Sequence, residues 1–322
     1  MITRRALIAG GLGLVSARAA AQPADLPLVG ALFISSPELS YVWKHLVADM
    51  RTLGYTEGAT VRYAARFTQE PARLPALATE IAALSPHLVY ANGDAPARVA
   101  AAQWPTVPIV AFTDDHVGAG LTDSLAHPSR NITGVSRLEA ELDTKRLELL
   151  HELAPSAHRI LVLRDPETAW PSRSAALEDA AARSGVEIDI HDVHGSGDVD
   201  NAVAAGETAG AKAVLVLGSP LLSSPDVEPR IRNAAMIHHL PTMVQIVRQV
   251  ALGNLAAYGI DEDAAIMRLA HMIDRVLKGT TPANIPIEQP TRFSFAINLR
   301  VARELGLSIP PIVLNRADEV IE

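Results

Sequence analysis

The clearest pattern in the chain is a recurrence of short apolar, β-branched runs separated by longer segments with apolar residues at helical spacing. The first four runs are Leu28–Ile34, Thr60–Phe67, His87–Ala91 and Val107–Thr113. Polar residues do not alternate along them, which is typical of strands covered on both faces. The segments between them, such as Tyr41–Leu53 and Leu74–Leu84, stop at glycine or Ser-Pro. Because strands and helices alternate, the pattern predicts a parallel α/β sheet.

A second series of similar runs begins near residue 158. Its members are His158–Leu163, Val186–Val193, Ala211–Leu217 and Leu240–Gln245. Ile160 follows Val29 by 131 residues and Ala213 follows Leu88 by 125, so the offset between the two series is nearly constant. Such a repeat indicates two similar units rather than one long sheet. The predicted fold class is therefore α/β, with two Rossmann-like lobes.

The first 21 residues have the pattern of an export signal. Arg4 and Arg5 precede an apolar stretch that ends in Ala19-Ala20-Ala21, small residues at the spacing that a signal peptidase requires. The paired arginines are compatible with twin-arginine export as well as with the Sec route, and both stay open. We expect residues 1–21 to be removed and the mature chain to begin near Gln22. No later segment is long and uncharged enough to predict a membrane-spanning helix.

The amino-acid composition excludes several kinds of chemistry and of binding partner. Cysteine is absent, which excludes disulfides, cysteine nucleophiles and the acylated cysteine that tethers a binding lipoprotein. The formal net charge of −8 becomes −11 when Arg4, Arg5 and Arg18 leave with the signal, and the sequence has no basic tract. Nucleic acid is therefore not an expected partner. We expect a freely diffusing monomer in the periplasm.

Motifs for catalysis, metal binding or cofactor binding give no positive signal. The sequence has no Gly-x-Ser-x-Gly elbow, Walker A loop or His-Glu-x-x-His helix, and the glycines at 10–13 lie inside the export signal. His238-His239 has no nearby acidic or cysteine partner, and Asp114-Asp115-His116 is a common loop composition. We expect no enzymatic activity, no metal and no cofactor.

Short polar loops follow successive predicted strands, and they supply the candidate ligand-binding residues. These are Ser35, Ser36, Asn92, Gly93, Asp94, Thr113, Asp114, Asp165 and Ser219. If two lobes face each other, the carboxyl ends of their strands converge on one cleft, and helices that begin there offer backbone N–H groups to a carboxylate. Ordinary helix capping by Ser, Asn and Asp accounts equally for each loop taken singly, so both interpretations stay open.

Four residues outside these loops join the candidates. Tyr41 begins the helix after the first loop, and Trp170 and Tyr258 could stack on a planar ligand or simply pack. Asp261 precedes a helix expected from Asp263 to Leu277, where it could pair with a ligand ammonium group or cap the helix. The two roles of Asp261 stay open.

Several longer segments resemble the ABC transporter substrate-binding family that includes tryptophan- and tyrosine-type binding proteins. The resemblance covers the mature chain and is carried by VGAGLTDSLAHPSRNITGVS at 117–136, KRLELLHELAP at 145–155, Tyr258-Gly-Ile-Asp261 and PPIVLNRADEVIE at 310–322. It implies a type I periplasmic binding fold, in which the chain crosses between the lobes three times. The crossings are expected near Thr133–Ser136, Leu255–Tyr258 and Pro282–Gln289. Residues 26–134 and 256–281 would then form the first lobe, and residues 135–255 and 282–322 the second.

The resemblance also implies a function. The protein is expected to capture a small molecule, amino-acid-like or otherwise polar or aromatic, in the cleft and to deliver it to an ABC transporter permease in the inner membrane. Two positions depart from the family pattern: Ser129-Arg130 replaces a common Gly-Gly pair, and Ser35-Ser-Pro37 lacks the His-Pro of many relatives. The second departure lies in a likely ligand loop. Direct transfer of an amino-acid specificity is therefore not expected from the resemblance alone.

Three other functions are compatible with a two-lobed fold. A periplasmic enzyme would need a nucleophile or an acid–base pair in the cleft, and the sequence offers only generic acids. A transcription regulator would need an N-terminal DNA-binding helix pair, where this chain has an export signal. A sensor that serves a membrane signalling receptor remains open, because the residues do not distinguish sensing from transport.

Overall fold

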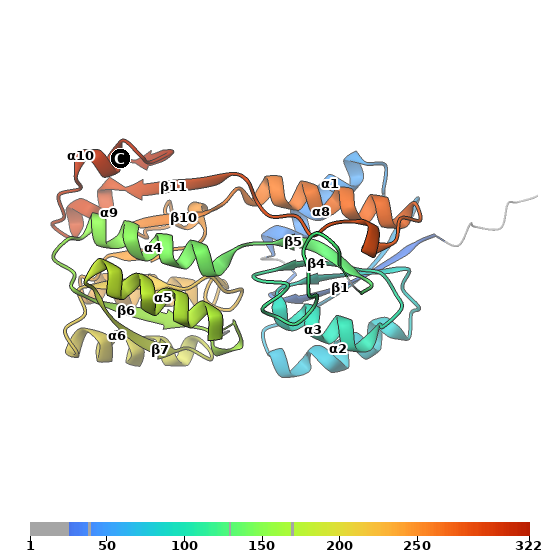
Figure 1. Cartoon of the computed structure of the whole chain (residues 1–322), viewed down its shortest axis with the longest axis horizontal. Coiled ribbons are helices and arrows are strands. Elements are labelled where there is room, and N and C mark those ends of the chain that lie inside the picture. The colour runs from blue at the N-terminus through green and yellow to red at the C-terminus, as the bar shows by residue number, and fades with distance from the viewer. Residues whose placement is uncertain (1–25, 38–39, 129, 169–170) are drawn as a thin grey trace, which may run out of the picture.

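The computed structural model describes residues 26–37, 40–128, 130–168 and 171–322. They form two α/β lobes that lie side by side along the longest axis of the molecule (Figure 1). This confirms the fold class predicted from the sequence. The predicted export signal and Trp170 lie outside the described residues.

The first lobe contains a five-stranded parallel sheet with the order β2-β1-β3-β4-β5. Its strands are β1 (Leu28–Ile34), β2 (Arg62–Thr68), β3 (Leu88–Asn92), β4 (Ile109–Thr113) and β5 (Ile132–Ser136). Every residue of β3, β4 and β5 is buried, as expected for strands covered on both faces.

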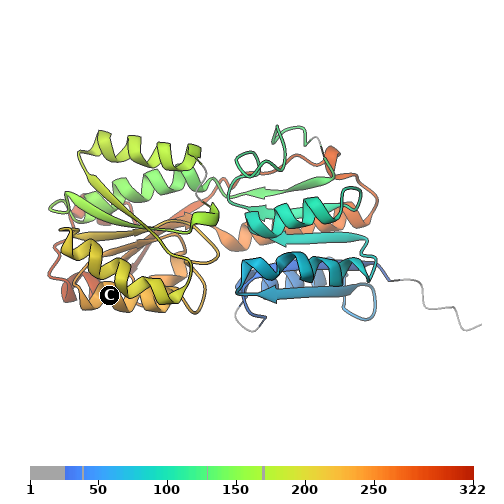
Figure 2. The ribbon, with the colours of Figure 1, turned by 90° about the horizontal axis from the view of Figure 1, so that it is seen from below.

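Two helices cover each face of this sheet (Figure 2). Helices α1 (Tyr41–Thr52) and α8 (Glu262–Leu277) pack on one face, against a core that includes Phe33 and Tyr90. Helices α2 (Leu74–Ala82) and α3 (Asp94–Gln103) pack on the other. The chain therefore returns to the first lobe late, to add α8 beside α1.

The second lobe contains a seven-stranded sheet with the order β12-β11-β10-β9-β8-β6-β7, in which only β10 and β11 pair antiparallel. Its strands are β6 (Arg159–Arg164), β7 (Glu187–Asp192), β8 (Ala213–Val216), β9 (Thr242–Val244), β10 (Ala256–Ile260), β11 (Phe293–Asn298) and β12 (Glu319–Ile321). Its helices are α4 (Glu139–Leu153), α5 (Pro171–Ser184), α6 (Val199–Thr208), α7 (Glu228–Ile237), α9 (Leu299–Glu304) and α10 (Pro311–Leu314). Helices α4, α5, α9 and α10 pack on one face, and α6 and α7 on the other.

The chain crosses between the lobes three times, through short connections. The first crossing joins the end of β5 to the start of α4, and the second joins the end of β10 to the start of α8. The third precedes β11, because Glu288 still donates its backbone N–H to Gly134 of the first lobe at 2.9 Å.

The lobe boundaries differ from those predicted. Residues 256–260 were expected in the first lobe, but they form β10, which pairs with β9 and β11 of the second sheet. Residues 282–288 were expected in the second lobe, but Ile285 is buried in the core of the first. Each crossing lies further along the chain than predicted, because an apolar run shows that a strand is buried but not which sheet it joins.

The described helices include none that is long and apolar enough to cross a membrane. In both sheets, the carboxyl ends of the central parallel strands point toward the junction of the lobes (Figures 1 and 2).

Candidate functional site

A cavity of about 890 Å³ lies between the two lobes. Four residues predicted from the sequence line it: Ser35, Tyr41, Asn92 and Asp261. The second lobe contributes the loop after β8 and the short helical turn Val247–Gln249. The cavity is therefore built where the predicted cleft was expected, from strand ends and helix starts of both lobes.

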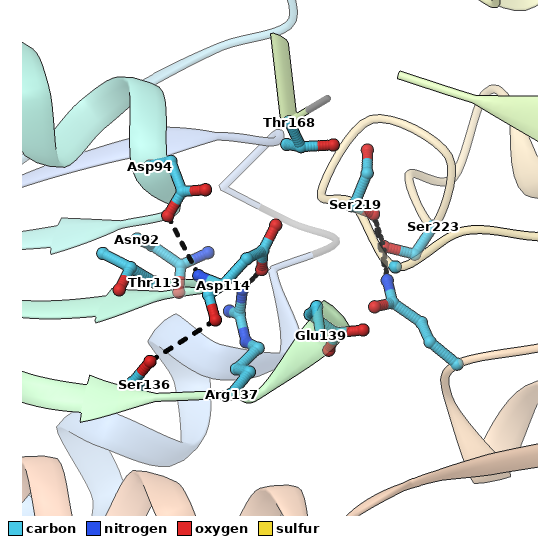
Figure 3. Close-up of polar contacts among 12 residues, drawn as sticks. Asn92, Asp94, Thr113, Asp114, Ser136, Arg137, Glu139, Thr168, Ser219 and Ser223 are labelled. Carbon is cyan, nitrogen blue, oxygen red and sulfur yellow. Dashed lines mark hydrogen bonds and ion pairs between the residues drawn. The ribbon is translucent and has the colours of Figure 1, made fainter. Parts of the chain in front are cut away.

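The first-lobe side of the junction is made by the loops after β3 and β4. Asp94 accepts a hydrogen bond through Oδ1 from the Asp114 backbone N–H at 3.0 Å (Figure 3). Asn92 accepts one through Oδ1 from the Tyr90 hydroxyl, also at 3.0 Å. Gly93 has φ +107°, and an added Cβ there would lie 3.2 Å from Pro220 of the other lobe. A glycine is needed at this position for its backbone conformation and for the close approach of the lobes.

The second-lobe side is made by the loops after β8 and β9. Ser219 donates through Oγ to Asp165 Oδ2 at 2.7 Å, and Gln245 donates through Nε2 to the Ser219 carbonyl and to Ser223 Oγ, each at 3.0 Å (Figure 3). A Cβ on Gly218 would lie 1.9 Å from Glu139 Oε2 and 2.6 Å from Gln245 Oε1. Glu139 and Gln245 therefore converge over Gly218, where any side chain would displace them.

The first crossing carries two charged residues that line the cavity, Arg137 and Glu139. Arg137 lies with its guanidinium carbon 3.7 Å from the centre of the Phe112 ring and donates to Asp114 Oδ1 at 2.8 Å. Between these two residues Leu138 has φ +63°, a left-handed conformation that is uncommon for a leucine. The backbone turns sharply here to bring both charges to the junction.

Buried arginines hold this region together. Arg146 is fully buried and donates to Glu139 Oε2 at 2.6 Å, to Asp143 Oδ1 at 2.7 Å and to the Tyr258 carbonyl at 2.7 Å. Arg173 donates to Asp143 Oδ2 and to the Gly218 carbonyl, both at 2.7 Å. Burial opposes ionisation of Glu139, but the charges of Arg146 and Arg173 lower its pKa, so this carboxylate is ionised.

Ionic contacts join the lobes around the cavity. Nη2 of Arg98, in α3, lies 3.6 Å from Oε2 of Glu167 of the second lobe. Arg248 of the second lobe pairs with Glu262 at the start of α8, and its guanidinium carbon lies 4.1 Å from the centre of the Tyr41 ring. These contacts, together with the approach of Gly93 to Pro220, describe a closed arrangement of the lobes.

Thr113, Tyr258 and Asp261 have partners within the protein. Thr113 is buried and its hydroxyl lies 2.5 Å from His116 Nδ1, whereas Tyr258 packs against Phe293 and Phe295. Asp261 caps α8, since its Oδ1 accepts from the Ala264 N–H at 3.0 Å, and its Oδ2 lies 3.1 Å from Arg292. Residues outside the lining of the cavity are Ser36, Gly93, Asp94, Thr113, Asp114, Asp165, Ser219 and Tyr258.

The polar residues that line the cavity without having been predicted include Arg137, Glu139, Gln245 and Arg248. Gln245 directly follows β9, so the rule that selected the other strand ends would have found it. Arg137 and Glu139 follow β5, a strand that was treated only as a crossing. Arg248 lies in a short helical turn that no sequence pattern marks.

The cleft can be compared with those of known proteins. The chain matches the family model described as ABC transporter substrate binding protein over residues 29–321. A tyrosine-binding protein of Clostridioides difficile (strain R20291) is 23% identical over 279 residues, which are 85% of this chain and 79% of that protein.

Solved structures share the architecture. An ABC domain from Streptococcus pneumonia in complex with L-Trp is 23% identical, with a TM-score of 0.82 over 92% of this chain and 100% of that chain. A conserved domain protein from Vibrio cholerae O1 biovar eltor is 24% identical, with a TM-score of 0.83 over 91% and 99% of the two chains. They show the same type I periplasmic binding fold. Because the family model spans nearly all of the described residues, this chain belongs to the ABC transporter substrate-binding proteins.

Proposed function

We propose that this protein collects a small molecule in the cleft between its lobes and delivers it to an ABC permease in the inner membrane. The observation that carries this proposal is the cavity of about 890 Å³ lined by both lobes. Its size lies within the roughly 300–1,000 Å³ typical of sites for small ligands. Because each lobe supplies one wall, a ligand there contacts both lobes only when they are closed.

Closure is the second element of the proposal. The lobes are connected by three short crossings, which allow hinge rotation without changes inside either sheet. A ligand that contacts both walls stabilises the closed form by its differential affinity for that form. The permease then receives a protein whose lobe arrangement reports that the cleft is loaded.

Chemistry of the walls supports a ligand with at least one hydrogen-bond acceptor. Arg137 and Asn92 offer donors from the first lobe, and Gln245 and Ser223 offer an acceptor and a hydroxyl from the second. Tyr41 supplies aromatic surface at the edge of the cavity. The related proteins are described as tyrosine-binding and as an L-Trp complex, so aromatic amino acids head the ligands to be tested.

A thermal-shift screen tests the binding function. Amino acids, purines, short carboxylates and sugars are each added to the mature protein, and a ligand that binds only the native state at 100 times its Kd should stabilise it by about 2.7 kcal/mol. The hit is then repeated with the Asn92→Ala, Gln245→Ala double variant. An equal shift in that variant would place the site elsewhere and contradict the cleft assignment.

The proposal also includes a periplasmic location and the absence of catalysis. The pattern of residues 1–21 supports export to the periplasm, and the intact mass of periplasmic protein should correspond to a chain beginning near Gln22. Periplasmic protein that retains Arg4 and Arg5 would contradict removal of the signal. A bound ligand should be recovered chemically unchanged, since His116 is buried beside Thr113 and does not line the cavity.

A further inference from the structure

Arg137 is the most enclosed cation in the described lining of the main cavity. Its side chain is only 11% exposed, whereas Lys44 and Arg248, which line the same cavity, are exposed. Arg137 lies at the first crossing, between the end of β5 and the start of α4. A charge with little water around it interacts more strongly with a partner than a charge at the surface does. Arg137 is therefore the cation of this cavity at which a ligand gains most.

The guanidinium of Arg137 has unused hydrogen-bond donors. An arginine carries five N–H donors, and the described residues accept only from Nη1, which donates to Asp114 Oδ1 at 2.8 Å (Figure 3). One flat face of the guanidinium lies over the Phe112 ring, 3.7 Å from its centre. No nitrogen of Arg137 is buried without a hydrogen bond, so the edge formed by Nε and Nη2 is accessible to a ligand. Two parallel N–H groups on one edge match the two oxygens of a carboxylate.

A second donor lies beside this edge. Asn92 at the end of β3 pairs in register with Phe112 of β4, so the two side chains lie on the same face of the sheet. Because Phe112 supports the guanidinium of Arg137, Asn92 is a close neighbour of that group. Oδ1 of Asn92 accepts from the Tyr90 hydroxyl, so Nδ2 is the part that can donate to a ligand. The first-lobe wall therefore presents two neighbouring donor groups.

The acids in the lining are less available. Glu139 pairs with Arg146 at 2.6 Å, and Asp261 pairs with Arg292 at 3.1 Å. Glu319 is exposed, on the edge strand β12. The partners of the remaining acids are Arg248 for Glu262, the Tyr41 hydroxyl for Asp263 and Asn254 for Glu228. A cationic group of a ligand has to compete with these partners, whereas an anionic group meets unused donors at Arg137.

Asp114 does not fully neutralise Arg137. Burial, and then the neighbouring carboxylate of Asp94, raise the pKa of Asp114 to about 8, although the charges of Arg137 and Arg173 act against this rise. The Asp114 carboxyl group is therefore mostly protonated near pH 7. Arg137 then keeps its positive charge beside a neutral acid, which leaves it able to pair with an anion from the cavity.

We propose that Arg137 binds the carboxylate of the solute through Nε and Nη2, with Asn92 beside it, and that the solutes are organic acids without an α-amino group. The inference rests on the proposed solute-binding function and adds a ligand class to it. In an α-amino acid the ammonium group is one carbon away from the carboxylate, so it would be held close to the guanidinium, a group of like charge. An acid that lacks the ammonium group avoids this repulsion.

The carboxylate is tested by calorimetry on the mature protein with matched acids and amides. The pairs are indole-3-propionate with indole-3-propionamide, 3-(4-hydroxyphenyl)propionate with its amide, and benzoate with benzamide. Where a pair binds, the acid should bind about tenfold more tightly or better, because its hydrogen bonds to Arg137 are charge-assisted. An amide that binds as tightly as its acid would overturn the proposal.

Arg137→Gln removes the charge and the paired N–H groups. The preference for acid over amide should then fall below about threefold. Arg248→Gln is the matched control, because it removes another arginine from the lining of the cavity. A change in closure weakens acid and amide alike, so this control should keep the wild-type ratio. If Arg137→Gln also keeps that ratio, Arg137 does not bind the carboxylate.

The absence of an α-amino group is tested with L-tryptophan against indole-3-propionate and L-tyrosine against 3-(4-hydroxyphenyl)propionate. The acid of each pair should bind the wild type at least as tightly as the amino acid does. An amino acid that binds about tenfold more tightly than its acid would overturn the ligand class and leave the solute-binding function intact.

A measurement with acetate does not depend on the identity of the natural solute or on the folding of a loss-of-charge variant. The Nε–H resonance of Arg137 is identified in ¹⁵N–¹H NMR spectra by its loss in Arg137→Lys, which keeps the positive charge. Acetate, the smallest carboxylate with a methyl group, should shift this resonance in the wild type with saturation, and acetamide should not. A resonance that acetate leaves unmoved would overturn the inference, whereas the solute-binding function is judged separately by the thermal-shift screen.

Discussion

Asp261 shows how much of a residue's role depends on its local contacts. It caps α8 through Ala264 N–H and also pairs with Arg292. Asp261→Ala removes the cap, and we expect the free energy of unfolding of the ligand-free protein to fall by about 1 kcal/mol. Asp261→Asn keeps an acceptor at the cap and should cost less than about half of that, because the pair with the exposed Arg292 contributes little. Denaturant unfolding of both variants measures the difference.

The same variants test the ammonium-binding role predicted for Asp261 from the sequence. That role requires Asp261→Asn to lose roughly 1.5–3 kcal/mol of ligand affinity. We expect affinity to change little, since Arg292 already lies beside the carboxylate and the same side chain caps α8. A tenfold affinity loss in Asp261→Asn with unaltered stability would assign the ammonium-binding role to Asp261.

Replacing Arg146 should lower the free energy of unfolding strongly. Arg146→Met keeps an unbranched side chain but leaves Glu139 and Asp143 without their shared partner in a fully buried position. Breaking a buried ion pair in this way costs roughly 3–5 kcal/mol. The neighbouring Lys145→Met, which removes only an exposed pair with Glu148, should cost under about 1 kcal/mol. If urea unfolding shows equal losses of stability for the two variants, Arg146 is not needed to balance the charges of Glu139 and Asp143.

At the scale of residues, the sequence predicts where a residue lies in the fold better than it predicts which residues it contacts. Ser35 and Asn92 were found because they follow buried strands, and strand ends converge in an α/β fold. The cluster around Arg146 could not be found in this way, because Tyr258, whose carbonyl accepts from Arg146, is 112 positions away in the chain. Tyr258 was itself predicted at the cleft, but its packing against Phe293 and Phe295 follows from a strand pairing that no local pattern reveals.

At the scale of elements, glycines mark the places where two strands approach closely. Gly134 in β5 has φ +150°, and an added Cβ would lie 1.8 Å from the Ala111 carbonyl oxygen of β4. Because a strand backbone cannot move aside as a flexible side chain can, Gly134→Ala should destabilise the protein by more than about 3 kcal/mol. Gly197→Ala, where a Cβ would meet open space, should change stability by less than about 0.5 kcal/mol. A small loss of stability in Gly134→Ala would mean that β4 and β5 separate easily.

The elements themselves were largely predictable. The eight predicted runs correspond to β1–β4 and β6–β9, with bounds that differ by a few residues. The central strands are apolar because both of their faces are buried, whereas the edge strands β2 and β7 are only partly buried. Lobe membership was less predictable. The strand Ala256–Ile260 joins the second sheet through hydrogen bonds to β9 and β11, and these depend on segments distant in the sequence.

At the scale of the whole molecule, function depends on the equilibrium between open and closed lobes. Contacts at the rim, distant from the buried charge cluster, tune this equilibrium without holding either lobe together. Arg248 is such a contact, since it pairs with Glu262 and lies over the Tyr41 ring, both across the junction. Its side chain is 43% exposed, so each lobe should fold normally without it.

We therefore predict that Arg248→Gln shifts the protein toward the open form. Loss of a partly exposed ion pair and a cation–π contact weakens closure by on the order of 1 kcal/mol. Because a cleft ligand binds the closed form, its Kd should rise by up to about fivefold, and small-angle scattering of the ligand-free protein should report a larger radius. Arg230→Gln, which breaks an exposed pair with Asp200 inside the second lobe, is the matched control and should leave both quantities unchanged. If Arg248→Gln behaves like this control, then rim contacts do not govern closure, and the buried pair of Arg137 with Asp114 beside the first crossing is the place to test next.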